Sequence, residues 1–215
     1  MAEFDLLKRY PRAQRDPKAR AAAKTPDDIR IAREFGYDFF DGDRRHGYGG
    51  YRYSPTRWAG VVEDLIEHYA PFDSVLDVGC AKGYMLQELR KQLPACRISG
   101  IDVSQYAIRN APEEIRQFLW VRSADDRCFP EKYFDLVVSI NTVHNLPRPG
   151  CIAALQEIER TGKQAYVTVD AYRTEEERKR MLDWNLTALT ILHVDEWLEL
   201  FKEAGYTGDW GFWGP

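Results

Sequence analysis

Small residues and two acids follow the first two predicted strands of this chain. Gly79, Ala81 and Gly83 lie in the stretch VLDVGCAKGYML, where a strand turns into a helix. Small residues at such a turn let backbone N–H groups and the helix N-terminus approach a polar or anionic ligand closely. Asp77 lies inside the first strand, and Asp102 ends the next one. A carboxylate at that strand end can accept hydrogen bonds from both ribose hydroxyls, so the pattern predicts a nucleoside-binding site.

The residue at position 84 separates two kinds of nucleoside site. A dinucleotide fingerprint needs a third glycine there, and the chain has Tyr84. Asp77 would also repel a pyrophosphate, since both groups are negative. An NAD-dependent reductase is therefore the less favoured alternative.

Polar residues also follow the fourth and fifth predicted strands, where we expect catalytic groups. His144 lies in the segment 141–146, and an imidazole titrates near neutral pH, so His144 is our candidate general base. A structural histidine in the first turn of the next helix is the alternative. Asp170 ends the fifth strand, where its carboxylate can orient an acceptor.

A segment rich in tyrosine, arginine and glycine spans residues 37–53. It has no helical or strand period, which is typical of a loop. Because exposed tyrosines are costly, we expect a lid that closes over a ligand and excludes water, and a permanently ordered loop is the alternative. The candidate substrate-binding residues are Arg44, Arg45, His46, Tyr48, Tyr51 and Arg52 in this loop, and Asn145, Tyr172 and Arg173 after the later strands.

These candidates are positioned by alternating strands and helices. Apolar, β-branched runs predict strands at 74–79, 97–102, 118–123, 134–140, 164–170 and 206–212. Amphipathic stretches predict helices at 55–70, 84–92, 105–114, 151–160, 175–183 and 195–204, and a capped helix at 29–35 closed by Gly36. The alternation predicts a doubly wound α/β fold with a mostly parallel sheet.

Composition and charge limit the classes of partner. Residues 1–24 hold 7 Lys/Arg and 3 Asp/Glu, so they carry +4 while the whole chain of 215 residues carries −4. An acidic body argues against nucleic acid, and the basic arm is expected to be solvated or to pack on a neighbouring subunit. No apolar run reaches the length of a membrane span, so we expect a cytoplasmic protein with no membrane partner. Four scattered cysteines indicate no metal site.

Three segments together resemble a known enzyme family. DVGCAKG at 77–83, GIDVS at 100–104 and FDLVVS at 134–139 are similar to the first three motifs of class I S-adenosylmethionine-dependent methyltransferases. The resemblance covers about residues 55–205. It implies a Rossmann-like methyltransferase fold, S-adenosylmethionine as cofactor and S-adenosylhomocysteine as product. Ala81 replaces the family's middle glycine, and we expect right-handed backbone and a slightly different turn there.

The resemblance also assigns roles to cofactor-binding residues. It implies that Asp77 holds the methionine ammonium, that Asp102 holds the ribose hydroxyls and that Val103 packs on the adenine. The remaining implied contacts are Gly79, Ala81 and Gly83 along the methionine and ribose, Ser123, Ala124 and Asp125 near the adenine amino group, and the Asn141 carbonyl on the ammonium.

The expected architecture has three parts: a basic arm (1–24), a helix with an aromatic cap loop (25–54) and a cofactor-binding domain (55–215). The expected activity is methyl transfer to O or N of a small polar metabolite. Arg44, Arg45 and Arg52 favour an anionic acceptor, such as a sugar nucleotide, a phosphorylated compound or a natural-product intermediate. A non-catalytic S-adenosylmethionine-binding regulatory module is the other alternative. A homodimer that covers a sheet edge is a further expectation.

Overall fold

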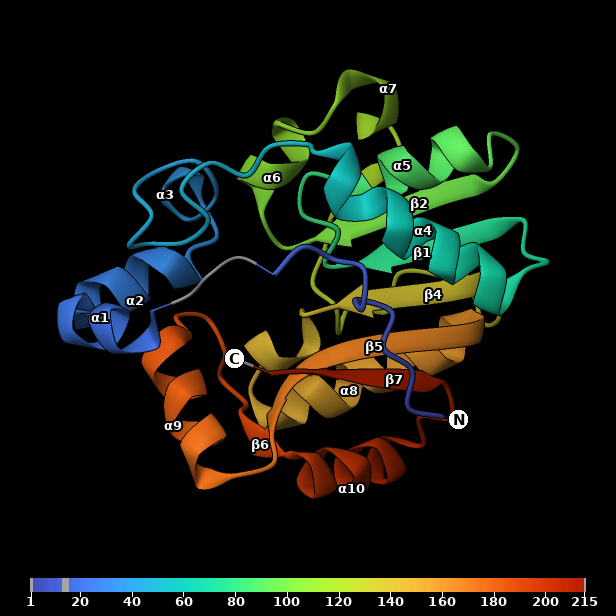
Figure 1. The fold of residues 1–215 in the computed structure, drawn as a ribbon. Coiled ribbons are helices and arrows are strands. Elements are labelled where there is room, and N and C mark those ends of the chain that lie inside the picture. The colour runs from blue at the N-terminus through green and yellow to red at the C-terminus, as the bar shows by residue number, and fades with distance from the viewer. Residues whose placement is uncertain (1, 13–15, 215) are drawn as a thin grey trace.

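A computed structural model describes residues 2–12 and 16–214 and contains one twisted sheet (Figure 1). Its strands are β1 (Ser74–Val78), β2 (Arg97–Asp102), β3 (Leu119–Val121), β4 (Phe134–Ile140), β5 (Gly162–Tyr172), β6 (Leu192–His193) and β7 (Asp209–Trp213). The order is β3-β2-β1-β4-β5-β6, with β7 paired to β5, and all these pairs are parallel. The predicted doubly wound α/β fold is confirmed.

Helices cover both faces of the sheet (Figure 1). One face carries α4 (Pro55–Tyr69), α5 (Tyr84–Gln92), α6 (Gln105–Arg109) and α7 (Glu113–Arg116), and the other carries α8 (Arg148–Thr161) and α10 (Val194–Ala204). Each face has its own apolar core, with Leu65 and Leu86 in one and Ile158 and Trp197 in the other. Because β1 lies between the two cores, all five of its residues are buried.

The remaining helices gather at one end of the sheet (Figure 1). They are α1 (Pro17–Ala23), α2 (Pro26–Arg33), α3 (Tyr37–Phe40) and α9 (Glu175–Trp184), and a short 3-10 helix, η1 (Val143–Asn145), follows β4. Helix α1 packs on α9, and α3 packs on α2 and α6. These contacts place residues 25–54, which we call the cap, over the carboxyl ends of the strands.

The N-terminal arm is not a free solvated tail over the part of it that the structure describes, because a few apolar residues anchor it to the sheet while most of its other residues stay exposed. Leu6 and Leu7 are fully buried, and Glu3 forms a parallel bridge with Trp210 of β7. The prediction failed because seven basic residues dominate the composition of residues 1–24, while a few apolar ones determine where the segment packs. The chain's own N-terminus therefore covers the β7 edge that we assigned to a second subunit. Residues 1 and 13–15 lie outside the described part.

Two local predictions need correction. Phe35 takes the left-handed conformation (φ +49°) after α2, and Gly36 instead precedes α3, a helix inside the segment predicted as a loop. The predicted helix 105–114 is two helices, because Pro112 cannot donate an N–H to the preceding turn.

Candidate active site

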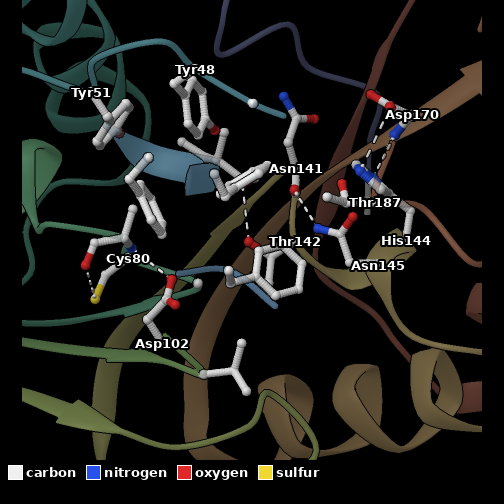
Figure 2. A pocket seen from close by; sticks show the side chains of 18 of the residues that line it. Tyr48, Tyr51, Cys80, Asp102, Asn141, Thr142, His144, Asn145, Asp170 and Thr187 are labelled. Carbon is white, nitrogen blue, oxygen red and sulfur yellow. Dashed lines mark hydrogen bonds and ion pairs between the residues drawn. The ribbon is translucent and has the colours of Figure 1, made fainter. Parts of the chain in front are cut away.

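A cavity of about 470 Å³ opens at the carboxyl ends of β1, β2, β4 and β5. Figure 2 shows Asp102 on one side of it and Asp170 with His144 on the other, with Asn141 between them. The cap and the N-terminal arm supply the facing wall, which includes Leu7, Tyr10, Tyr48 and Tyr51. The strand ends and the cap therefore enclose one shared space.

The turn after β1 has left-handed backbone at three alternate positions, with φ of +84° at Gly79, +51° at Ala81 and +72° at Gly83. A Cβ on Gly79 would lie 1.9 Å from the Thr142 hydroxyl oxygen, so only glycine fits there. The expectation of right-handed backbone at Ala81 is wrong. Its strained conformation is supported by an N–H donated to Asp102 Oδ2 at 2.8 Å.

Backbone donors hold the Asp102 carboxylate in place. It accepts N–H groups from Ala81 at 2.8 Å and from Ser104 at 2.7 Å. Burial raises the pKa of Asp102, and these two hydrogen bonds partly offset that rise. The turn after β1 and the end of β2 are thus joined through one carboxylate that lines the cavity.

Asp77 is a buried acid that lines the same cavity. No hydrogen bond or ion pair joins its carboxylate to another residue in the described part of the chain. Burial, and then the negative charge of Asp102, raises the pKa of Asp77 to about 8. Two neighbouring acids without a cationic partner fit a ligand that carries positive charge, as the sulfonium and ammonium of S-adenosylmethionine do.

Most of the other predicted cofactor residues line the cavity as well. They are Val103, Ser123, Ala124 and Asn141. Gly83 and Asp125 do not line it. Gly83 instead packs against Ile115 and Leu119, which leave no room for a Cβ, and Asp125 accepts a short hydrogen bond from the Ser123 hydroxyl.

Asn141 follows β4 in the left-handed conformation (φ +53°). Its backbone carbonyl accepts a weak hydrogen bond from the Asn145 side-chain amide at 3.4 Å. The side-chain Oδ1 atoms of Asn141 and Asn145 are buried without a hydrogen-bond partner. Unpaired buried acceptors at a cavity wall are available to a donor on a ligand.

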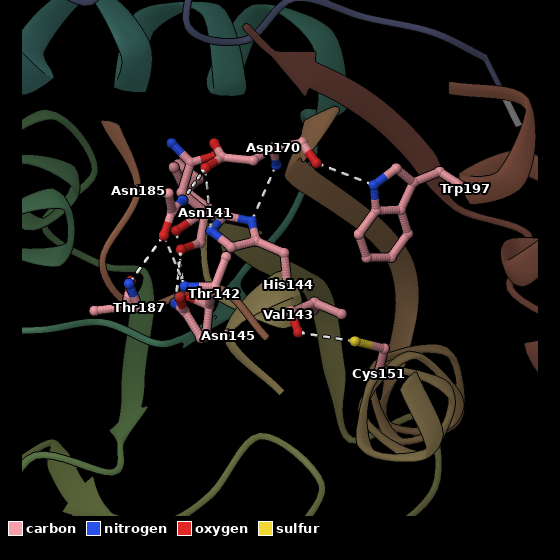
Figure 3. A network of polar contacts seen from close by, with 12 residues as sticks. Asn141, Thr142, Val143, His144, Asn145, Cys151, Asp170, Asn185, Thr187 and Trp197 are labelled. Atoms are coloured by element: carbon pink, nitrogen blue, oxygen red, sulfur yellow. Dashed lines mark hydrogen bonds and ion pairs between the residues drawn. The ribbon is translucent and has the colours of Figure 1, made fainter. Parts of the chain in front are cut away.

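His144 and Asp170 face each other across the ends of η1 and β5 (Figure 3). His144 Nδ1 accepts the backbone N–H of Asp170 at 3.0 Å, and His144 Nε2 lies 3.6 Å from Asp170 Oδ2. Because Nδ1 is an acceptor, the neutral ring carries its proton on Nε2. Burial lowers the pKa of His144, which favours this neutral form.

Two further neighbours fix the position of Asp170 (Figure 3). Trp197 Nε1 donates to its backbone carbonyl at 3.0 Å, and Asn185 Nδ2 donates to its Oδ2 at 2.7 Å. Asn185 Oδ1 in turn accepts the N–H groups of Thr187 and Ala188. The loop after α9 thus presents the Asp170 carboxylate to the cavity.

The structure separates the predicted substrate-binding residues into two groups. Arg44, Tyr48, Tyr51 and Asn145 line the cavity, as do the candidate catalytic residues His144 and Asp170. Arg45, His46, Arg52, Tyr172 and Arg173 do not. Arg45 and His46 lie beside Asp28, Arg173 pairs with Glu3, and the Tyr172 ring contacts His193.

Several lining residues were missed by the sequence analysis. They are Leu7, Tyr10, Arg20, Arg33, Trp58, Trp184, Asn185, Thr187 and Trp213. Asn185 and Thr187 stand in the segment WNLT, whose Asn and Thr after a helix are a signal for a loop near the site. The others belong to the arm, to helices and to strand β7, and they have no local motif because only tertiary packing brings them to the cavity.

Comparison with known proteins agrees with this geometry. Residues 75–165 match the methyltransferase domain family. The mitochondrial arginine-hydroxylase NDUFAF5 of Rattus norvegicus is 35% identical over 120 residues, which are 54% of this chain and 32% of that protein. The chain thus spans about a third of the length of the curated relatives it matches.

Solved structures share the fold. One is a Haloferax volcanii protein in complex with the Trm112 methyltransferase activator, with a TM-score of 0.53, 24% identity, and coverage of 69% of this chain and 74% of the other. Another is geranyl diphosphate methyltransferase bound to GPP and sinefungin, with a TM-score of 0.54, 15% identity, and coverage of 66% and 57%. S-adenosylmethionine is the cofactor of the family. Residues 75–165 therefore match a methyltransferase domain, within a chain that has the fold of class I S-adenosylmethionine-dependent methyltransferases.

Proposed function

We propose that this protein transfers the methyl group of S-adenosylmethionine to an oxygen or nitrogen of a small, polar, anionic metabolite. The observation that carries the proposal is the shared cavity, which Asp77, Asp102 and Asp170 all line. We assign Asp77 and Asp102 to the cofactor and Asp170 to the acceptor. In that arrangement Asp77 binds the ammonium and Asp102 the ribose, with Val103 and Ser123 along the adenine.

Positioning accounts for most of the catalysis. When bound, the cofactor supplies a methyl group on a positively charged sulfur, which leaves as a neutral thioether with the electron pair of the broken bond. The protein has to hold the acceptor atom opposite that bond, and such positioning can supply roughly 7–11 kcal/mol. Tyr48, Tyr51 and Asn145 are the residues we assign to this task, and the cap keeps water out.

Asp170 is the group we assign to remove the acceptor's proton. His144 has its Nδ1 lone pair committed to a backbone N–H and a proton already on Nε2, so neither nitrogen is free to accept another. We therefore assign His144 to hold Asp170, and the Asp170 carboxylate takes the proton of a hydroxyl or ammonium acceptor.

Arginines at the cavity support an anionic acceptor. Arg33 and Arg44 line it, and neither forms an ion pair within the described part of the chain. The Arg44 and Arg20 guanidinium groups lie 5.5 and 4.5 Å from the centre of the Trp184 ring. We assign this arginine group to a phosphate or carboxylate of the acceptor, because guanidinium groups bind such anions with paired hydrogen bonds. Arg45 and Arg52 are not part of that assignment, because they do not line the cavity.

One experiment tests the activity. The protein is incubated with S-adenosylmethionine and a library of phosphorylated and carboxylated metabolites, and S-adenosylhomocysteine release is measured. For an acceptor that must lose a proton, we expect Asp170→Asn to reduce kcat by about 100-fold or more. His144→Asn, which keeps an acceptor oxygen near the Asp170 N–H, should reduce it less.

Two outcomes would contradict the proposal. Cofactor binding without release for any acceptor would favour the regulatory module. A product that gains an oxygen atom instead of a methyl group, read by mass spectrometry, would favour a hydroxylase, the activity for which the NDUFAF5 relatives are named.

A further inference from the structure

A buried lysine connects the turn after β1 to the cap loop, which we define as residues 37–53. Lys82 stands between Ala81 and Gly83 in that turn, yet it does not line the cavity. Its Nζ donates to Asp41 Oδ2 at 2.6 Å and to the Tyr51 carbonyl at 3.0 Å. Lys82 is only 5% exposed, although lysine is among the residues least often buried.

Neighbouring contacts reinforce the same connection. The Tyr106 hydroxyl donates to Asp41 Oδ2 at 2.7 Å, and the Tyr84 hydroxyl donates to the Tyr51 carbonyl at 3.2 Å. The Ser104 hydroxyl donates a short hydrogen bond to the Phe35 carbonyl just before the cap loop. Tyr84 starts the helix after the β1 turn, and Ser104 and Tyr106 follow Asp102. The two segments assigned to the cofactor therefore carry these contacts to the cap.

The other side of the cap loop faces the acceptor. Tyr48 and Tyr51 line the cavity, and the Tyr51 N–H donates to Asp41 Oδ1 at 3.0 Å. Asp41 thus accepts from Lys82, Tyr106 and Tyr51 together. The Lys82–Asp41 pair, in which the lysine is buried and the aspartate partly buried, is satisfied only when both partners hold their positions, because a displaced partner leaves the other charge without compensation. A displacement of the turn after β1 must therefore displace Tyr51 as well.

We infer that Lys82 is a positioning residue that couples the two halves of the cavity, so that cofactor binding orders the acceptor wall. The inference rests on the proposed cofactor site. By linkage the coupling is reciprocal, so an ordered cap strengthens cofactor binding by the same factor.

Hydrogen exchange of the full chain, with and without saturating S-adenosylhomocysteine, tests the coupling. In the wild type we expect the ligand to slow amide exchange within residues 37–53 by about tenfold. In Lys82→Met this slowing should fall below about twofold. Lys163→Met is the matched control, because Lys163 pairs with Asp135 at the amino ends of β5 and β4, the opposite end of the strands from the cavity. It should keep the full wild-type slowing.

Two further variants separate coupling from simple structural damage. Asp41→Asn with Lys82→Met removes both charges, so no carboxylate is left unpaired, and this double variant should fold yet still lack the ligand effect. Lys82→Arg keeps the charge and should recover part of it. A merely structural lysine would instead raise exchange in the cap equally with and without ligand.

The outcome is distinct from a failure of the proposed function. If calorimetry shows that the wild type does not bind S-adenosylhomocysteine, the proposed cofactor site is wrong. If the wild type binds it and the cap exchanges at an unchanged rate, or Lys82→Met retains the full slowing, the coupling is overturned while the cofactor site stands.

Discussion

At the scale of single residues, the cavity holds acids that are kept buried for a positive ligand. Without that ligand, Asp77 has a pKa of about 8, far above the value of an unfolded chain. The folded state then binds the proton more tightly than the unfolded state. Asp77 therefore lowers the stability of the free protein progressively as pH rises from about 4 towards 8.

Asp77→Asn should remove this loss of stability, because asparagine does not titrate. We expect its unfolding temperature without ligand to exceed the wild-type value at pH 8, with a difference that shrinks towards pH 5, while its affinity for S-adenosylmethionine falls. Thermal unfolding across that pH range, paired with calorimetry, measures both effects. An equal difference at both pH values would mean that Asp77 does not titrate as the geometry requires.

The positions of the acids and of Gly79 could be predicted from the sequence, because these residues lie at or near strand ends and the strands follow from the local apolar pattern. The backbone at Ala81 was not readable in this way. Alanine disfavours positive φ, and a hydrogen bond from its N–H to Asp102, 21 residues later, supports it there. The tautomer of His144 likewise depends on a backbone N–H from another strand.

At the scale of elements, the N-terminal arm is a structural strap rather than a tail. Arg9 Nε and one of its terminal nitrogens bind both oxygens of Asp64 at 3.0 and 2.7 Å. The Tyr10 ring contacts Trp58 edge to face at 5.1 Å. Leu6 is completely buried, and its N–H donates to the hydroxyl of Tyr166 in β5 at 3.3 Å. The strap therefore contributes both to the core and to the cavity wall.

Leu6→Ala should lower the free energy of unfolding by about 2–5 kcal/mol, because it removes buried methyl groups and leaves a cavity. Leu182→Ala, on α9 at 45% exposure, is the matched control and should change it by less than about 1 kcal/mol. Urea unfolding measures both. Equal effects would show that the strap does not pack as described.

Strands and sheet helices were predictable because their apolar period records which face is buried. Helix α5 and strand β4 begin and end where the spacing of apolar residues predicts. The N-terminal strap and the cap loop have no such regular spacing of apolar residues. Their positions are set by contacts such as Phe40 on Tyr51 and Glu3 on Trp210, which a local pattern does not contain.

At the scale of the whole molecule, charge is separated along the cavity. Asp77, Asp102 and Asp170 line the strand ends, and Arg33 and Arg44 line the cap side. The chain as a whole is acidic, at −4, so these arginines form a local exception. No described helix is long and apolar enough to cross a bilayer.

Replacing Arg33 and Arg44 together by alanine should raise the KM of an anionic acceptor by about tenfold and leave kcat nearly unchanged, since the arginines bind the acceptor away from the reacting atoms. Arg52→Ala, which lies outside the cavity lining, is the control. Steady-state kinetics at low and high salt measures the change, and added salt should weaken acceptor binding in the wild type. A fall in kcat with KM unchanged would contradict this assignment.

The most direct test of the central claim is calorimetric titration of S-adenosylmethionine into the wild type, Asp102→Ala and Asp195→Ala, the last being an exposed acid on α10. Circular dichroism checks that each variant is folded. We expect binding by the wild type and Asp195→Ala, and no detectable binding by Asp102→Ala. Equal affinity of Asp102→Ala and the wild type would contradict it.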